Sequence, residues 1–131
     1  MTKEGYTSNE RIKEESDFLR GNISDLLHDG SITHFPSEEE FLLKFHGITQ
    51  QDNRDERLIR KKNGQERNWL FMLRLRLPGG RMTPSQWLAA ETLSDQFGNG
   101  TLKLTTRQAI QIHGVVKQDL KQTMKDIHHA A

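Results

Sequence analysis

Cysteine is absent from the 131 residues of this chain. No disulfide, thiolate nucleophile, zinc–thiolate site or iron–sulfur ligand can therefore come from it. No apolar run is long enough to cross a bilayer, and the first residues do not show the charged-then-apolar pattern of a secretory leader. These absences lead us to expect a cytoplasmic protein with no membrane contact.

The chain also lacks an excess of either charge, since it has 19 basic and 18 acidic residues and a net charge of +1. This balance argues against a dedicated nucleic-acid binder, which usually has a strong basic excess. Only 33% of the residues are hydrophobic, and the mean hydropathy is -0.80. The length suits one domain with a modest core, so the polarity predicts an extended arm or a surface that something else covers.

Common catalytic motifs are missing as well. No two of the 6 histidines stand four residues apart with a glutamate nearby, so a zinc hydrolase is a poor interpretation. The Pro-Gly-Gly turn at residues 78–80 lacks the Lys-Ser/Thr ending of a phosphate-binding loop. There is no G-x-S-x-G nucleophile elbow. We do not expect side chains of this chain alone to carry out catalysis.

The clearest pattern lies between residues 70 and 115. Leu73, Leu75 and Leu77 alternate with Met72, Arg74 and Arg76, which predicts a strand at residues 70–77. Thr83 and Pro84 predict the start of a helix that ends before Gly98. Further elements are expected in the order strand, strand, helix, at residues 102–105, 110–113 and 117–129. Strand–helix–strand–strand–helix predicts an α+β fold, a ferredoxin-like half-domain that spans residues 67–131.

Residues 1–66 are expected to form an extended, partly helical N-terminal arm. Disorder is predicted for residues 1–7, followed by a helix from Ser8 and a second short helix from Asn22. Beyond these helices we expect a loop, a strand and a polar loop that runs into a charged helix, at residues 31–40, 41–46 and 49–57.

The predicted sheet has one polar face without any acid. If the strands pair in one sheet, this face carries the following cations and donors, with the last at a break between strands: Arg74, Arg76, Lys103, Gln111, His113 and Arg107. A solvated face of an antiparallel sheet is the simpler interpretation, although such a face usually mixes charge signs. Arginine at alternate strand positions presents rigid donor forks that suit carboxylates and other oxyanions.

Four segments carry a resemblance to a known family. Residues 104–114 (LTTRQAIQIHG) are similar to the first siroheme-binding segment of the nitrite/sulfite reductase family. Residues 74–80 (RLRLPGG) resemble its substrate-side strand. Residues 14–21 (EESDFLRG) and 45–55 (FHGITQQDNRD) resemble its assimilatory sulfite reductase branch. The similarity runs from about residue 10 to the end of the chain, in the same order as the N-terminal part of a much longer enzyme.

The resemblance implies roles for individual residues. Arg74 matches an arginine that helps bind sulfite. The positions that match siroheme contacts are Lys103, Thr105, Thr106, Arg107, Gln111 and His113, with Arg76 as a further cofactor contact. Lys103 stands where many members have arginine, so the charge is kept but the bidentate fork is lost. Thr106 stands where some members have asparagine.

The resemblance also implies a reaction and partners. The family reduces sulfite to sulfide at siroheme, which receives electrons from a 4Fe-4S cluster through a shared cysteine. Because this chain has no cysteine, we expect a fragment that is inactive without the missing C-terminal half of the enzyme. The electron donor would be an NADPH-dependent flavoprotein subunit or ferredoxin. Two alternatives remain open: a nitrite reductase of the same family, and a non-catalytic module that uses the basic sheet to bind anions, tetrapyrroles or nucleic acid.

Overall fold

The computed structural model describes residues 5–131, so the predicted disorder of residues 1–7 falls mostly outside the described residues. The described helices are α1 (Ser8–Glu15), α2 (Ile23–His28), α3 (Ser37–Leu43), α4 (Arg54–Lys62), α5 (Pro84–Phe97) and α6 (Lys117–Ala130), with the short 3-10 helices η1 (Lys44–His46) and η2 (Pro78–Gly80). The strands are β1 (Ile48–Asp52), β2 (Trp69–Leu75), β3 (Leu102–Leu104) and β4 (Ile110–Val115). None of the described helices is long and apolar enough to cross a membrane.

The strands form one four-stranded sheet in the order β1-β2-β4-β3. Every neighbouring pair is antiparallel. Strands β2 and β3 therefore run in the same direction, with β4 inserted between them, as in a split β-α-β unit. This arrangement confirms the predicted ferredoxin-like half-domain. The edge position beside β2 is taken by β1, which precedes the half-domain in the sequence.

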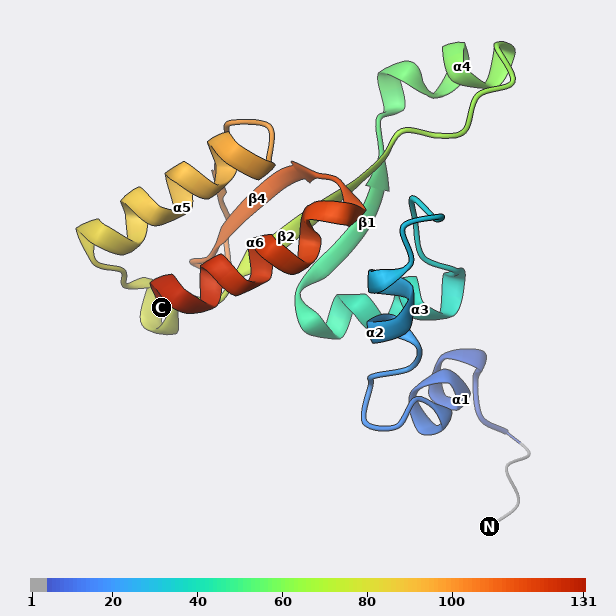
Figure 1. The fold of residues 1–131 in the computed structure, drawn as a ribbon. Helices are drawn as coiled ribbons and strands as arrows, with labels where there is room; N and C mark the ends of the chain where they lie inside the picture. The colour runs from blue at the N-terminus through green and yellow to red at the C-terminus, as the bar shows by residue number, and fades with distance from the viewer. Residues whose placement is uncertain (1–4) are drawn as a thin grey trace.

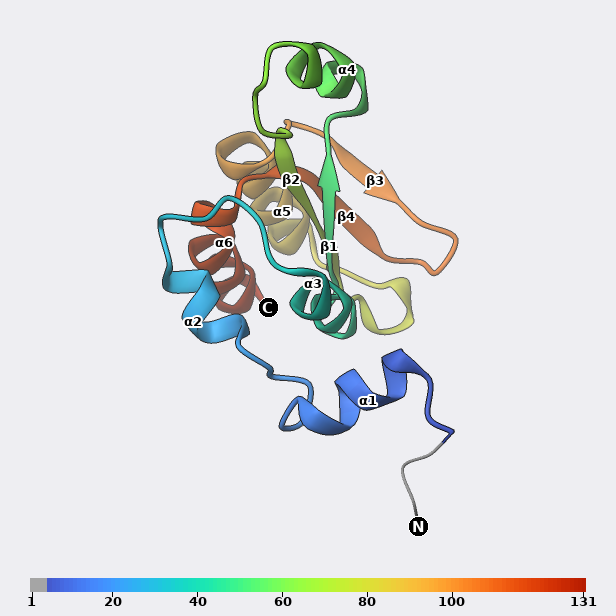
Figure 2. The same ribbon diagram turned by 90° about the vertical axis from the view of Figure 1, so that its right-hand side faces the viewer.

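Helices cover one face of this sheet. Figures 1 and 2 show α5 and α6 side by side along it, and α2 packs against α6. Side chains from β1, β2, β4, the helices and the loop before α3 form a common core, whose members are Phe35, Leu43, Ile48, Phe71, Leu73, Leu93, Ile112, Val115 and Leu120. Burial alternates at the start of β4, where Ile110 and Ile112 are buried and Gln111 is partly exposed, whereas on β2 the three consecutive residues Phe71, Met72 and Leu73 are all buried before Arg74 becomes exposed.

Local signals explain where α5 begins and ends. Thr83 and Gln86 form a capping box at its start, and Pro84 occupies the first turn. At its end the chain comes very close to β4, since a Cβ on Gly98 would lie 2.7 Å from the carbonyl oxygen of His113. Only glycine fits at this contact, because a side chain on residue 98 would collide with that carbonyl oxygen.

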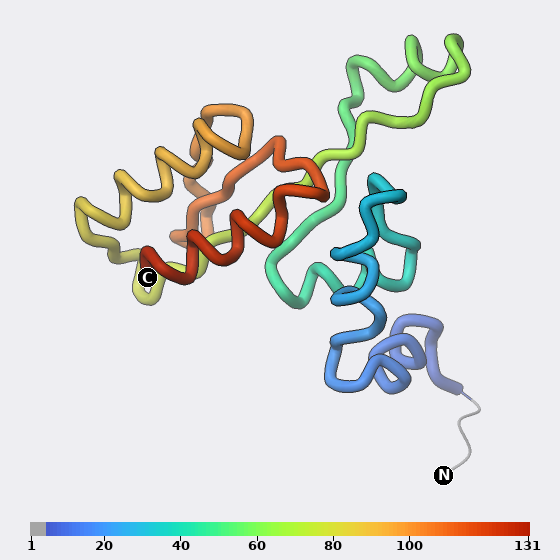
Figure 3. The backbone as a smooth tube through the Cα atoms, viewed as in Figure 1, coloured from blue at the N-terminus to red at the C-terminus, as the bar shows by residue number. Residues whose placement is uncertain are grey.

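Helix α4 leaves the body of the molecule as an excursion between β1 and β2 (Figures 1 and 3). Asn53 caps its start. Two of its arginines pair locally, because Arg57 pairs with Asp52 at the end of β1 and Arg60 pairs with Glu56. This confirms the charged helix predicted after the polar segment.

The strand predicted at residues 41–46 is wrong, because this segment forms α3 and η1 instead. Apolar residues fill both alternating sets of positions here, and the helix buries the adjacent Leu42 and Leu43. Three glutamates in the first turn favour a helix at this point. The loop predicted at residues 31–40 accordingly ends at Pro36, directly before α3 begins.

The strand of this region lies instead at β1, where a polar loop was predicted. Its central Gln50 is buried, and the side-chain amide exchanges hydrogen bonds of 2.6 and 3.1 Å with the backbone of Phe35. Because a glutamine occupies a core position here, the apolar alternation that normally predicts a strand is missing from the sequence. Strand β2 also ends at Leu75, so that Arg76 and Leu77 of the predicted strand lie beyond it.

Candidate anion-binding site

The uncovered face of the sheet carries a row of polar side chains across three strands. Arg74 on β2 is opposite Gln111 on β4, and Gln111 is opposite Lys103 on β3. Residues in register share a face, and this face is the one opposite the core residues Leu73 and Ile112. The structure thus brings together three of the residues that the sequence placed on one face.

His113 extends this row along β4. Its Nε2 lies 2.9 Å from Oε1 of Gln111. Burial, and then the charge of Lys103, lower the pKa of His113 below its ordinary value. Since an amide oxygen only accepts, the neutral imidazole donates from Nε2. The NH2 group of Gln111 is then left to donate to another acceptor.

A hollow of about 460 Å³ lies at the end of this row. It is bounded by η1, by the end of β2 and by the turn between β3 and β4. Its lining comprises Lys44, Phe45, His46, Gly47, Arg74, Leu75, Arg76, Leu77, Arg107 and Ala109. We call this space the cationic hollow. It collects Arg74, Arg76 and Arg107 from the sequence prediction.

Gly47 sets the position of Arg74 at the wall of the cationic hollow. The backbone N–H of Arg74 donates to the carbonyl oxygen of Gly47 over 2.8 Å. Gly47 has a φ of 78°, and a Cβ there would lie 3.2 Å from the carbonyl oxygen of Arg74. Glycine permits both the left-handed backbone and this close approach.

The turn between β3 and β4 presents Arg107. The Oγ1 of Thr105 accepts a hydrogen bond from the backbone N–H of Ala109, 3.2 Å away. Gln108 then adopts a φ of 57° and donates its N–H to the carbonyl oxygen of Thr105. Thr106 and Arg107 are left exposed at the tip. Arg107 lines the cationic hollow, whereas Thr105 and Thr106 do not.

The cations of the cationic hollow are not neutralised within the described residues. The ion pairs found among residues 5–131 involve other residues, mainly in the arm and in the α4 excursion. Each charge-assisted hydrogen bond to an anion contributes about 1.5–3 kcal/mol. Four cations without carboxylates around one hollow suit an anion that carries several negative charges.

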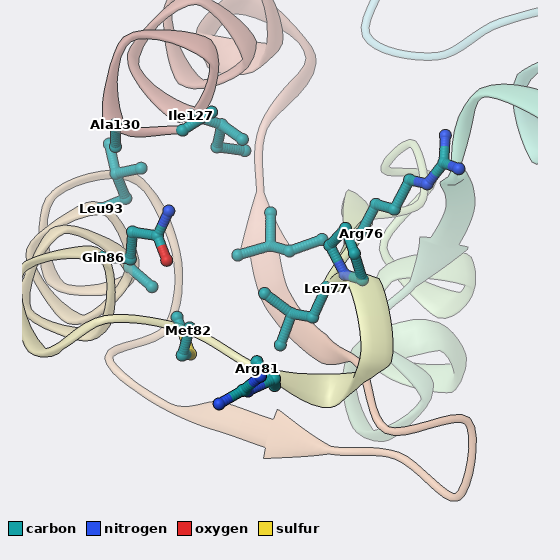
Figure 4. A pocket seen from close by; sticks show the side chains of 12 residues that line it. Arg76, Leu77, Arg81, Met82, Gln86, Leu93, Ile127 and Ala130 are labelled. Carbon is teal, nitrogen blue, oxygen red and sulfur yellow. The ribbon is translucent and has the colours of Figure 1, made fainter.

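A second hollow of about 360 Å³ lies between α5, α6 and the segment that follows β2 (Figure 4). Its walls are mainly apolar and include Leu77, Met82, Leu93 and Ile127. The side chain of Arg76 leads away from these residues in Figure 4. Its lining does not suit an anion.

The sequence pattern does not predict that Lys44, Phe45 and His46 line the cationic hollow. The predicted strand placed Lys44 and Phe45 on opposite faces, whereas η1 brings both to the lining. The only available signal was the resemblance of the segment that starts at Phe45.

These features define an α+β half-domain with a helix-covered face and a cationic, uncovered face. The family described as nitrite/sulfite reductase ferredoxin-like half domain matches residues 63–130. The chain belongs to this family, which confirms the resemblance found in the sequence.

Curated relatives extend the match beyond the half domain. The chain is 56% identical over 124 residues to the sulfite reductase (NADPH) subunit beta of Saccharomyces cerevisiae, which covers 92% of this chain and 8% of the relative. It is 48% identical over 121 residues to the sulfite reductase (NADPH) hemoprotein beta-component of Bacillus subtilis, with 92% of this chain and 21% of the relative covered. The chain thus spans only a small part of the length of these relatives.

A solved structure shows the same fold. The NirA protein of Mycobacterium tuberculosis matches with a TM-score of 0.73 and 15% sequence identity, over 95% of this chain and 24% of that chain. At this identity the likeness concerns the fold alone.

Proposed function

We propose that this chain is the N-terminal part of an assimilatory sulfite reductase hemoprotein, in which it holds the carboxylates of siroheme and the sulfite anion. The observation that carries the proposal is the row of Arg74, Gln111 and Lys103, which continues into the cationic hollow without a neutralising carboxylate among the described residues. The names of the relatives support sulfite as the substrate.

The donor set fits siroheme, a tetrapyrrole with many carboxylates. When bound, siroheme supplies the redox chemistry, together with a 4Fe-4S cluster whose cysteine ligands cannot come from this chain. Lys103 and Arg107 supply positive charge, and the NH2 group of Gln111 supplies a neutral donor. The hydroxyl of Thr105 accepts from Ala109 and keeps its own proton for donation. Thr106 and Arg76 complete the proposed cofactor contacts.

Arg74 is the proposed sulfite contact. Its position on β2 joins the polar row to the cationic hollow, so it faces both anions in this proposal. Fixed cations beside the oxyanion favour its binding and the build-up of negative charge during reduction. The neutral His113 holds the amide of Gln111 in one orientation, which makes His113 a positioning residue.

Partners follow from the same proposal. The missing C-terminal half of the hemoprotein would supply the cluster, so the present chain alone would be inactive. The relatives are named as NADPH enzymes, which supports a flavoprotein reductase subunit as the electron donor, with ferredoxin as the alternative. We place the enzyme in the cytoplasm, without nucleic-acid or membrane partners.

The family description names nitrite as well as sulfite. Nitrite reduction is therefore the second candidate function, and the two are separated by measuring electron uptake with each anion. A non-catalytic anion- or tetrapyrrole-binding module would show binding without any uptake.

The test is an absorbance titration of the chain with siroheme, alone and with the C-terminal half supplied in trans. Arg107→Ala is compared with Lys125→Ala, which removes an exposed cation from α6. We expect the reassembled protein and the Lys125 variant to gain the siroheme spectrum and sulfite-dependent electron uptake, and the Arg107 variant to lose both. Failure of siroheme to bind even in the reassembled protein would overturn the proposal.

A further inference from the structure

The chain contains the sequence Asn-Gly twice, at residues 63–64 and 99–100. Asparagine is chemically labile, and a following glycine does not shield the backbone nitrogen with a Cβ. Loss of the side-chain amide (deamidation) requires that this backbone nitrogen approach the side-chain carbonyl carbon of the asparagine. Hydrogen bonds that hold either group therefore slow it, and the structure treats the two sequences differently.

The first Asn-Gly pair is exposed to solvent. Asn63 follows the last turn of α4, and its side-chain amide makes no hydrogen bond within the described residues. The N–H of Gly64 donates a long hydrogen bond of 3.3 Å to the carbonyl oxygen of Lys61, within the same exposed turn. A Cβ on Gly64 would meet no atom within 4 Å. Residues 61–67 are all exposed.

The second pair is held in place. Oδ1 of Asn99 accepts hydrogen bonds from the backbone N and the hydroxyl of Thr101, at 3.1 and 2.6 Å. The N–H of Gly100, which would be the attacking group, donates to the carbonyl oxygen of Ser94 over 3.0 Å. The N–H of Asn99 donates to the carbonyl oxygen of His113 over 2.8 Å. Both reacting groups are therefore occupied.

We propose that Asn63 is a site of spontaneous deamidation and that the fold protects Asn99 from the same reaction. The backbone nitrogen of Gly64 attacks Cγ of Asn63, and a new C–N bond forms. The bond from Cγ to the side-chain nitrogen breaks, and ammonia leaves with the proton of the attacking amide. Water then opens the cyclic imide at either carbonyl, which yields aspartate or isoaspartate without any oxidant or reductant.

The product changes the end of α4. A carboxylate replaces a neutral amide at the C-terminal end of the helix, where the partial charge of the helix is already negative. The isoaspartate form also inserts an extra carbon into the main chain between α4 and β2. Both changes weaken the last turn of α4, within the excursion between β1 and β2.

The test follows both sites in one sample. The chain is aged at mildly alkaline pH, folded and, in parallel, unfolded in guanidinium chloride, and peptide mass spectrometry separates asparagine, aspartate and isoaspartate. In the folded chain we expect Asn63 to convert at least about tenfold faster than Asn99, because the Asn99 turn must first open. In the unfolded chain the two rates should converge.

Two variants complete the design. Asn63→Gln should abolish nearly all conversion in the folded chain, and Asn99→Gln should leave it unchanged. Equal rates at the two sites of the folded chain would overturn the proposal. So would a folded chain whose Asn63 stays intact over a period in which the unfolded chain converts.

Discussion

The Nε2 atom of His46 lies 2.8 Å from the backbone carbonyl oxygen of Leu19, which is 27 residues earlier in the chain. A carbonyl oxygen only accepts, so Nε2 carries the proton. Leu19 belongs to a turn in which three consecutive non-glycine residues, Asp17, Phe18 and Leu19, have positive φ. His46 thus ties a strained turn of the arm to the wall of the cationic hollow.

The first prediction concerns this link. Replacing His46 with alanine removes the donor to Leu19, at a cost of about 1 kcal/mol. The strained turn should then open more often, because left-handed backbone in non-glycine residues persists only when its surroundings hold it. Amide hydrogen exchange over residues 16–22 should accelerate. His129→Ala, near the end of α6, is the matched control, and equal acceleration in both variants would contradict the link.

The second prediction concerns Gly47. Gly47→Ala should lower the free energy of unfolding by about 1–2 kcal/mol for the positive φ, with a further 1 kcal/mol or so for crowding against the carbonyl oxygen of Arg74. Gly64→Ala is the control, since Gly64 has a φ of 67° with no atom within 4 Å of the added Cβ. Urea unfolding measures the difference. Equal losses in the two variants would show that the contact with Arg74 is unimportant.

The third prediction concerns pH. The folded state lowers the pKa of His113 below its ordinary value of 6.5. The unfolded chain therefore binds a proton first as the pH falls, so stability from this residue is complete above 6.5 and is lost as the pH falls toward the folded value. The urea midpoint should decline over this window, and less steeply in His113→Gln than in His129→Gln.

A measurement on the residue itself separates the two causes of this shift. Lys103→Met removes the second cause and leaves burial in place. An NMR titration should then show the pKa of His113 move upward, toward its ordinary value. An unchanged titration would mean that Lys103 does not act on His113.

The fourth prediction concerns the proposed sulfite contact. In the reassembled protein, Arg74→Ala should weaken sulfite binding by about tenfold or more, since a charge-assisted hydrogen bond contributes about 1.5–3 kcal/mol. Arg74→Lys keeps the charge but not the bidentate fork, so its sulfite affinity should fall between those of the wild type and Arg74→Ala. Sulfite titrations of the three proteins provide the comparison. Wild-type affinity in Arg74→Ala would remove Arg74 from the proposed site.

The half-domain could be predicted from the sequence because several independent signals agree there. Alternation on β2 and β4, the Thr83 cap and the glycine after Phe97 all indicate the same elements. The arm could not be predicted in the same way. In residues 41–46 apolar side chains occupy both alternating sets of positions, so the pattern does not distinguish a strand from a helix. In β1 the polar residue Gln50 is buried in the core, so the strand lacks an apolar pattern.

The site shows the same division. Arg74, Gln111 and Lys103 could be placed together because strand alternation fixes which side chains share a face. Lys44 could not, because its position depends on a 3-10 helix and on the left-handed Gly47 that follows it. The roles of the predicted site residues, and the boundary between arm and half-domain at residue 66, stay predictions.

Strand β1 has a consequence for how this fold is maintained. It lies outside residues 63–130, which match the family, yet it pairs with β2 along its whole length. A shorter chain that begins at residue 63 would leave β2 as a free edge with unpaired backbone groups, and such edges recruit strands from other molecules. The segment that matches the sequence family is therefore shorter than the segment that covers both edges of β2, because the latter must also include β1.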